Sequence, residues 1–213
     1  MSHADAPPLP EALLEGRVVA VARRLDAAAA VRLCDALLAG GLDVLEVTME
    51  GGEGPTAIAA ARGRGLEVGA GTVLTIEDAA AAVDAGAGFL VSPHVDAALI
   101  AWANARGVPF LAGAFTPTEV LTAHRAGAAA VKVFPAAIGG PAHVAALRAP
   151  FPGIGLVPTG GVDADTVAAF LGAGALAVGV GAWLTAADDP ALVAERAGAL
   201  LAAASAVGRH GPV

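Results

Sequence analysis

The chain has 213 residues, of which 56% are hydrophobic and 15% charged, so it can form one domain with a sizeable core and is too apolar for a disordered chain. Its net charge of −8 argues against nucleic acid and anionic membrane surfaces as partners, but leaves an anionic small molecule open as the ligand of a local pocket. No apolar run could span a bilayer, and the first residues lack signal-peptide features. The single cysteine, Cys34, allows no intrachain disulfide. We therefore expect a cytoplasmic protein.

In chain order, the sequence predicts a short helix at Pro10–Glu15 and then eight apolar runs, each followed by an alanine-rich helical segment. Four of the runs follow an Ala-Gly pair, at Ala39, Ala85, Ala126 and Ala173, and this pattern is typical of a helix that ends at glycine before a strand. The other four are RVVAVAR (17–23), EVGAGTV (67–73), PFLAGAF (109–115) and GLVPTGG (155–161). Helices are expected, for example, at Ala27–Leu38, Glu77–Asp84, Asp96–Ala105, Pro117–Arg125 and Asp163–Leu171.

Eight such units in about 200 residues predict a (β/α)₈ TIM barrel, a single domain over residues 1–213 with an extra N-terminal helix. The alternative is an open doubly wound sheet. The barrel is favoured because the repeat runs to eight and a helix closes the chain. In such barrels the active site lies at the carboxyl ends of the strands, which we call the mouth.

One lysine interrupts the apolar run AAVKVF at 129–134. Strand side chains alternate in direction, so Ala130, Lys132 and Phe134 share one face, opposite Val131 and Val133. Valines suit the helix-covered outside of a barrel, which points Lys132 into its interior. By the same alternation Glu46, in the run VLEVT at 44–48, also points inward.

Structural interpretations are open for both residues. Lys132 could be a lysine whose stem lies along the sheet surface, and Glu46 could be half of a structural ion pair. The functional interpretation is sharper. Apolar neighbours favour the neutral amine of Lys132, which attacks carbonyls to form a Schiff base, and Glu46 is the candidate proton shuttle.

Glycines at the ends of the seventh and eighth runs predict an anion site. Gly160, Gly161, Gly179 and Gly181 allow backbone N–H groups to approach a phosphate or carboxylate closely, and Asp163 is placed to cap the next helix. Loops at these two strands are the usual phosphate site of a TIM barrel.

Metal and nucleotide motifs are not evident. His3, His94, His124, His143 and His210 are scattered without ligand spacing, so we expect no metal and no cofactor. The phrase GAGTVL at 69–74 has only two of the three dinucleotide-binding glycines.

The phrases VLEVTM, VGAGTVLT, FLVSP, GAFTPTE, VKVFPA and PTGGV occur in the order and spacing of a known family. From residue 17 to residue 184 the chain resembles the 2-keto-3-deoxy-6-phosphogluconate / 4-hydroxy-2-oxoglutarate aldolases. The resemblance implies a class I pyruvate aldolase with a (β/α)₈ barrel, usually a homotrimer. It implies pyruvate and an aldehyde, often phosphorylated, as the small-molecule partners.

The resemblance also implies site residues. The Schiff-base lysine falls on Lys132 and the proton-transfer glutamate on Glu46. Substrate contacts fall on Arg23, Thr72, Pro93, Phe134, Thr159, Gly160 and Gly161.

Two positions depart from the family pattern. Glu50 replaces an arginine that binds the pyruvate carboxylate in many members, and Ala182 replaces a serine near the phosphate. We therefore expect Arg23 or backbone N–H groups to hold the carboxylate. We expect Glu50 to turn into solvent on a loop that Gly51 and Gly52 make adaptable, and the alternative is that it contacts a hydroxyl or cation of the substrate.

The leading hypothesis is an aldolase that cleaves a 2-keto-4-hydroxy acid to pyruvate and an aldehyde. A phosphosugar epimerase or isomerase on the same barrel is an alternative, with Lys132 acting only as a charge. A catalytically degenerate barrel that binds an anionic metabolite is a third hypothesis, which Glu50 and Ala182 keep open.

Overall fold

The computed structural model describes residues 6–208 and contains the eight predicted strands. The strands are β1 (Val18–Ala22), β2 (Val44–Thr48), β3 (Glu67–Gly71), β4 (Leu90–Val91), β5 (Phe110–Ala114), β6 (Ala130–Val133), β7 (Leu156–Pro158) and β8 (Val178–Val180). The helices are α1 (Glu11–Gly16), α2 (Ala27–Ala39), α3 (Gly54–Ala61), α4 (Ile76–Asp84), α5 (Ala97–Asn104), α6 (Pro117–Arg125), α7 (Ala136–Arg148), α8 (Val167–Gly172), α9 (Ala182–Thr185) and α10 (Pro190–Ser205).

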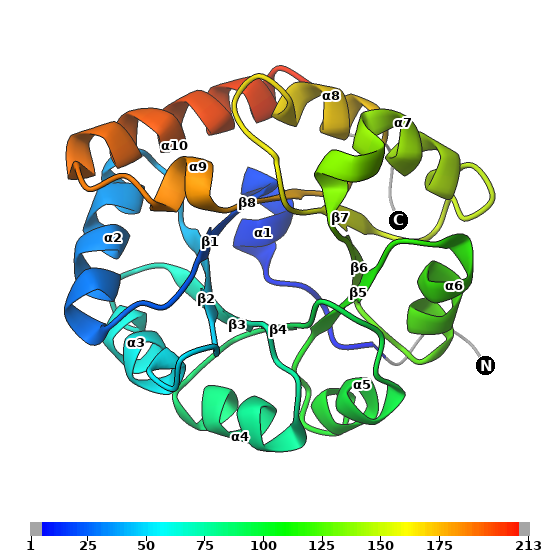
Figure 1. The fold of residues 1–213 in the computed structure, drawn as a ribbon, viewed down its shortest axis with the longest axis horizontal. Coiled ribbons are helices and arrows are strands. Elements are labelled where there is room, and N and C mark those ends of the chain that lie inside the picture. The colour runs from blue at the N-terminus through cyan, green and yellow to red at the C-terminus, as the bar shows by residue number, and fades with distance from the viewer. Residues whose placement is uncertain (1–5, 209–213) are drawn as a thin grey trace.

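The strands form one parallel sheet in the order β7-β6-β5-β4-β3-β2-β1-β8. A parallel bridge between Thr159 and Gly179 joins the two ends of this sheet, so the barrel is nearly closed. Figure 1 shows the strands as an inner ring with α1 within its outline and the later helices around it. The predicted (β/α)₈ barrel is confirmed, as is the short N-terminal helix, which begins one residue later than expected.

Alternating side chains divide the apolar residues into two layers. Val131 and Val133 belong to the larger cluster, between the strands and the helices, whereas Ala130 belongs to a smaller cluster inside the barrel. Leu13 of α1 is fully buried in the inner cluster, and α1 leads directly into β1. Helix α1 therefore covers the end of the barrel opposite the mouth (Figure 1).

Most predicted helices begin where the sequence supplies a cap. The side chains of Thr75 and Thr116 complete capping boxes at α4 and α6. Asp163 lies one turn before α8, which begins at Val167 and not at Asp163 as expected. Asp163 instead caps the turn that leads into α8: its side chain accepts hydrogen bonds from the backbone N–H and the hydroxyl of Thr166, and its carbonyl oxygen accepts one from the N–H of Val167 at 3.0 Å.

Candidate active site

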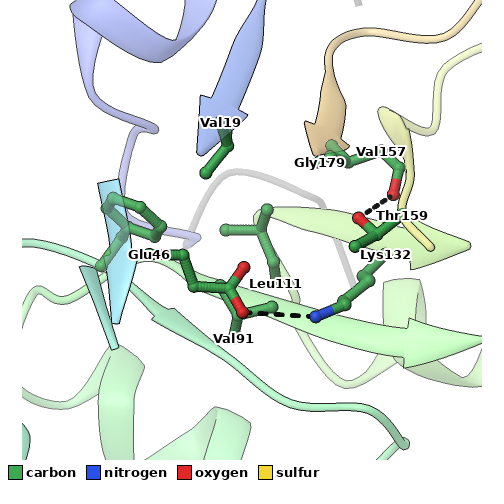
Figure 2. A pocket seen from close by; sticks show the side chains of 9 residues that line it. Val19, Glu46, Val91, Leu111, Lys132, Val157, Thr159 and Gly179 are labelled. Carbon is green, nitrogen blue, oxygen red and sulfur yellow. Dashed lines mark hydrogen bonds and ion pairs between the residues drawn. The ribbon is translucent and has the colours of Figure 1, made fainter. Parts of the chain in front are cut away.

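Lys132 and Glu46 meet inside the barrel. Lys132 lies on β6 and Glu46 on β2, and Lys132 Nζ donates a hydrogen bond to Glu46 Oε1 at 3.3 Å. The two side chains are only 6% and 4% exposed to solvent. Figure 2 shows them pointing toward one another from facing strands. Both inward orientations predicted from strand alternation are observed.

The pair opens onto a small pocket with largely apolar walls. Its lining consists of Val19, Glu46, Phe89, Val91, Leu111, Lys132, Val157, Thr159 and Gly179. Desolvation in such a pocket disfavours isolated charges, and the contact between Lys132 and Glu46 pairs the two. Sequence reasoning did not single out the five apolar residues. Strand alternation, which places each of them on the inner face, was the available signal.

Thr159 follows β7 and closes the pocket beside β8. Its hydroxyl donates a hydrogen bond to the carbonyl oxygen of Val157 at 3.3 Å. A Cβ at Gly179 would lie 2.8 Å from the Thr159 methyl carbon, so only glycine leaves room for Thr159 there. These two sequence-predicted residues are therefore brought together with Lys132 and Glu46.

Phe134, Gly160 and Gly161 form the next layer toward the mouth. The Phe134 ring centre is 5.6 Å from Lys132 Nζ, which is within cation–π range. Gly160 packs against this ring and Gly161 packs against Ala137, and both glycines have positive φ angles, of 92° and 82°. The two loops after β6 and β7 therefore approach each other closely.

Four further predicted residues lie outside the pocket lining. Arg23 follows β1, and Gly181 follows β8. Thr72 follows β3 with a φ of 55°, an unusual conformation for a residue with a side chain. The Pro93 backbone lies against Gly113, the strand neighbour of Lys132. These residues surround the mouth at the strand ends.

Glu50 does not turn freely into solvent, so that expectation is wrong. Arg23 Nη1 donates a hydrogen bond to Glu50 Oε1 at 3.0 Å, and Arg24 Nε lies 4.0 Å from the same oxygen. The Glu50 side chain is 26% exposed, compared with 55% for Arg23. Two cations that follow β1 attract the carboxylate, and the chain turns after Glu50 at Gly51 and Gly52, which have positive φ angles.

The remaining titratable groups suggest no second catalytic centre. Burial raises the pKa of the Cys34 thiol to about 11, which leaves it unreactive. Among residues 6–208, no group of three or more His, Cys, Asp or Glu side chains is arranged to hold a metal ion, and no helix is long and apolar enough to cross a membrane. His3 and His210 lie outside the described residues.

The chain matches curated relatives over most of its length. The family model for KDPG and KHG aldolase matches residues 9–195. A 2-dehydro-3-deoxy-phosphogluconate aldolase from Treponema pallidum is 38% identical over 84% of this chain and 87% of its own length. A probable 2-dehydro-3-deoxy-6-phosphogalactonate aldolase from Rhizobium meliloti is 35% identical over 95% of this chain and 97% of its own length.

Solved structures agree with this result. The KDPG aldolase from Legionella pneumophila, with pyruvate captured as a covalent carbinolamine intermediate, has a TM-score of 0.76 and 28% identity. The match covers 92% of this chain and 96% of that one. The chain therefore belongs to the KDPG and KHG aldolase family and is a lyase.

Proposed function

We propose that this protein is a Schiff-base (class I) aldolase. It cleaves a 2-keto-3-deoxy sugar acid, phosphorylated or not, or 4-hydroxy-2-oxoglutarate, to pyruvate and an aldehyde. The observation that supports this most is the buried contact between Lys132 and Glu46, one amine and one carboxylate 3.3 Å apart in an apolar pocket. The carbinolamine captured in the Legionella relative supports the same class of covalent chemistry.

Imine formation needs a neutral amine and a proton donor. Glu46 accepts a proton from Lys132, and Nζ then attacks the C2 carbonyl carbon of the substrate. In the resulting carbinolamine, the C2 hydroxyl leaves as water with the proton that Glu46 returns. The product is an iminium, with Glu46 again a carboxylate.

Carbon–carbon cleavage uses the iminium as the electron sink, so the chain needs no cofactor for this step. Glu46 accepts the proton of the C4 hydroxyl, and the aldehyde carbonyl forms as the C3–C4 bond breaks. The bonding electrons form an enamine on Lys132. Glu46 then protonates C3, and water releases pyruvate and the free amine.

The residues at the mouth supply substrate contacts in this proposal. Phe134, Thr72 and Pro93 lie beside the pyruvate part, and Arg23 binds an anionic group. Thr159 and Gly179 contact the substrate beside Lys132, and the loops after β7 and β8 bind the distal end through Gly160, Gly161 and Gly181. Ala182 offers no hydroxyl there, so a phosphate would have one donor fewer than in members with serine, a loss of about 1 kcal/mol.

We further infer a cytoplasmic homotrimer, which is the usual assembly in the family that the sequence resembles. Light scattering coupled to size exclusion checks the assembly. A monomer or dimer at micromolar concentration would contradict it.

Trapping with pyruvate and borohydride tests the proposal sharply, because Lys132 is the only lysine in the chain. Reduction of the imine should add a three-carbon carboxyethyl group to the peptide that contains Lys132. The matched control is Lys132→Met, in which a terminal α-amine is the remaining primary amine. Wild-type protein that gains no group at Lys132, although folded and incubated with excess pyruvate, would refute the aldolase proposal.

A further inference from the structure

The carboxylate of Glu46 lies in space that a neighbouring glycine leaves open. Gly71 is the last residue of β3, next to β2, and Thr48 of β2 is its register partner. A Cβ at Gly71 would lie 2.6 Å from Glu46 Cδ and 2.7 Å from Cγ, and closer still to Oε1, the atom that contacts Lys132. Real Cβ atoms essentially never approach other heavy atoms so closely.

Turn geometry does not explain this glycine. Gly71 is buried within a strand, and its φ angle is not among the positive values that favour glycine. Its backbone is also fixed in place, because its carbonyl oxygen accepts a hydrogen bond from the backbone N–H of Met49 at 2.8 Å. A side chain at position 71 would therefore displace the flexible end of Glu46 rather than the strand.

We infer that Gly71 is a positioning residue for catalysis, whose missing side chain allows the Glu46 carboxylate to reach Lys132. This inference rests on the proposed function of Glu46 as the proton shuttle. The Gly71→Ala variant is expected to fold, because a carboxylate end can swing aside at low cost. Displacing that end by about 1 Å, however, is expected to lower kcat about 100-fold.

A double-mutant cycle tests the inference. Gly71→Ala is measured in the wild-type and in the Glu46→Ala background, for melting temperature and for kcat. In the wild-type background both should fall, and the pH–rate profile should approach that of Glu46→Gln. In the Glu46→Ala background Gly71→Ala should cost little further, because the three atoms nearest to the new Cβ, all in the Glu46 side chain, are gone.

The matched control is Gly69→Ala, on the same strand and the same inner face. The three atoms nearest to a Cβ there all belong to the Phe89 ring, although Gly69 is the register partner of Glu46. The cost of Gly69→Ala in melting temperature should therefore be equal in both backgrounds. Gly172→Ala, where a Cβ would meet no atom within 4 Å, controls for glycine replacement itself.

An equal cost of Gly71→Ala in both backgrounds would overturn the inference. If Gly71→Ala alone is insoluble, the double variant decides: a soluble double variant supports the contact with Glu46, and an insoluble one refutes it. The melting-temperature cycle needs no activity, so it stays informative even if pyruvate trapping refutes the aldolase proposal.

Discussion

Replacing Glu50 with glutamine should tighten the binding of a phosphorylated substrate. The Glu50 carboxylate lies 3.0 Å from Arg23 and 4.0 Å from Arg24. It therefore competes with any substrate anion for the Arg23 guanidinium. An anion on the free side of that guanidinium would lie about 6 Å from Glu50, where two unit charges repel by about 0.7 kcal/mol in water and about 3 kcal/mol at an effective dielectric constant of 20.

The observed exposure selects between these limits. Arg23 is 55% and Glu50 26% exposed, so water screens the pair and the repulsion is nearer the lower limit, at about 1 kcal/mol. Glu50→Gln should then lower KM about fivefold for a phosphorylated 2-keto-3-deoxy acid and leave kcat nearly unchanged. For an unphosphorylated substrate whose distal end is uncharged, the change in KM should be small where Arg23 holds the phosphate, and equally large where Arg23 holds the carboxylate that both substrates carry.

The assay measures pyruvate release with both substrates at low and high salt. The gain in KM should shrink as salt rises, because salt screens exposed charges. Glu53→Gln is the matched control, since it removes the same charge from the same loop at an exposed side chain. Arg23→Ala should raise KM for both the wild-type and the Glu50→Gln background. A large loss of kcat/KM for Glu50→Gln with both substrates would refute this reasoning, because Glu50 would then bind substrate directly.

Glu46→Gln keeps the shape of the side chain but removes the proton shuttle, so kcat should fall about 10²–10⁴-fold with an unchanged circular dichroism spectrum; an active variant would leave Glu46 a structural partner only. Cys34 should resist a thiol reagent at pH 8 until the protein unfolds, because its pKa is about 11, and rapid labelling of the native protein would contradict its burial. Thr116→Ala should lower the free energy of unfolding by about 1 kcal/mol through loss of the α6 cap, as measured by urea titration. Backbone N–H groups of Thr116 and Phe115 hold the pKa of Glu119 below its usual range. The contribution of Glu119 to stability should therefore be present above about pH 4.3 and be lost as the pH falls through the lowered pKa. A Glu119→Gln variant should not show this loss of stability.

The barrel and the pair of Lys132 and Glu46 could be predicted from the sequence for the same reason. A covered parallel strand is apolar on both faces, so a charged residue within it is conspicuous, and a period of two then assigns its direction. Lys132 and Glu46 both satisfy these conditions, and both point inward as predicted.

The contact of Glu50 with Arg23 could not be predicted in this way. Glu50 lies beyond the end of β2, where the alternation of a strand no longer applies, and Gly51 and Gly52 permit many loop paths. Which path is adopted depends on Arg23 and Arg24, which follow a different strand.

The distribution of cations supports the proposed chemistry. The chain has eleven arginines and one lysine, and that lysine is buried at the centre of the barrel. Arginine stays charged at all working pH values, whereas an amine can lose its proton in a dry pocket and act as a nucleophile. Throughout the chain, therefore, side chains that need only a positive charge are arginines, and the single amine faces a carboxylate that can take its proton. The acidic overall charge does not oppose an anionic substrate, because Arg23 and Arg24 place positive charge at the mouth, where Glu50 moderates it.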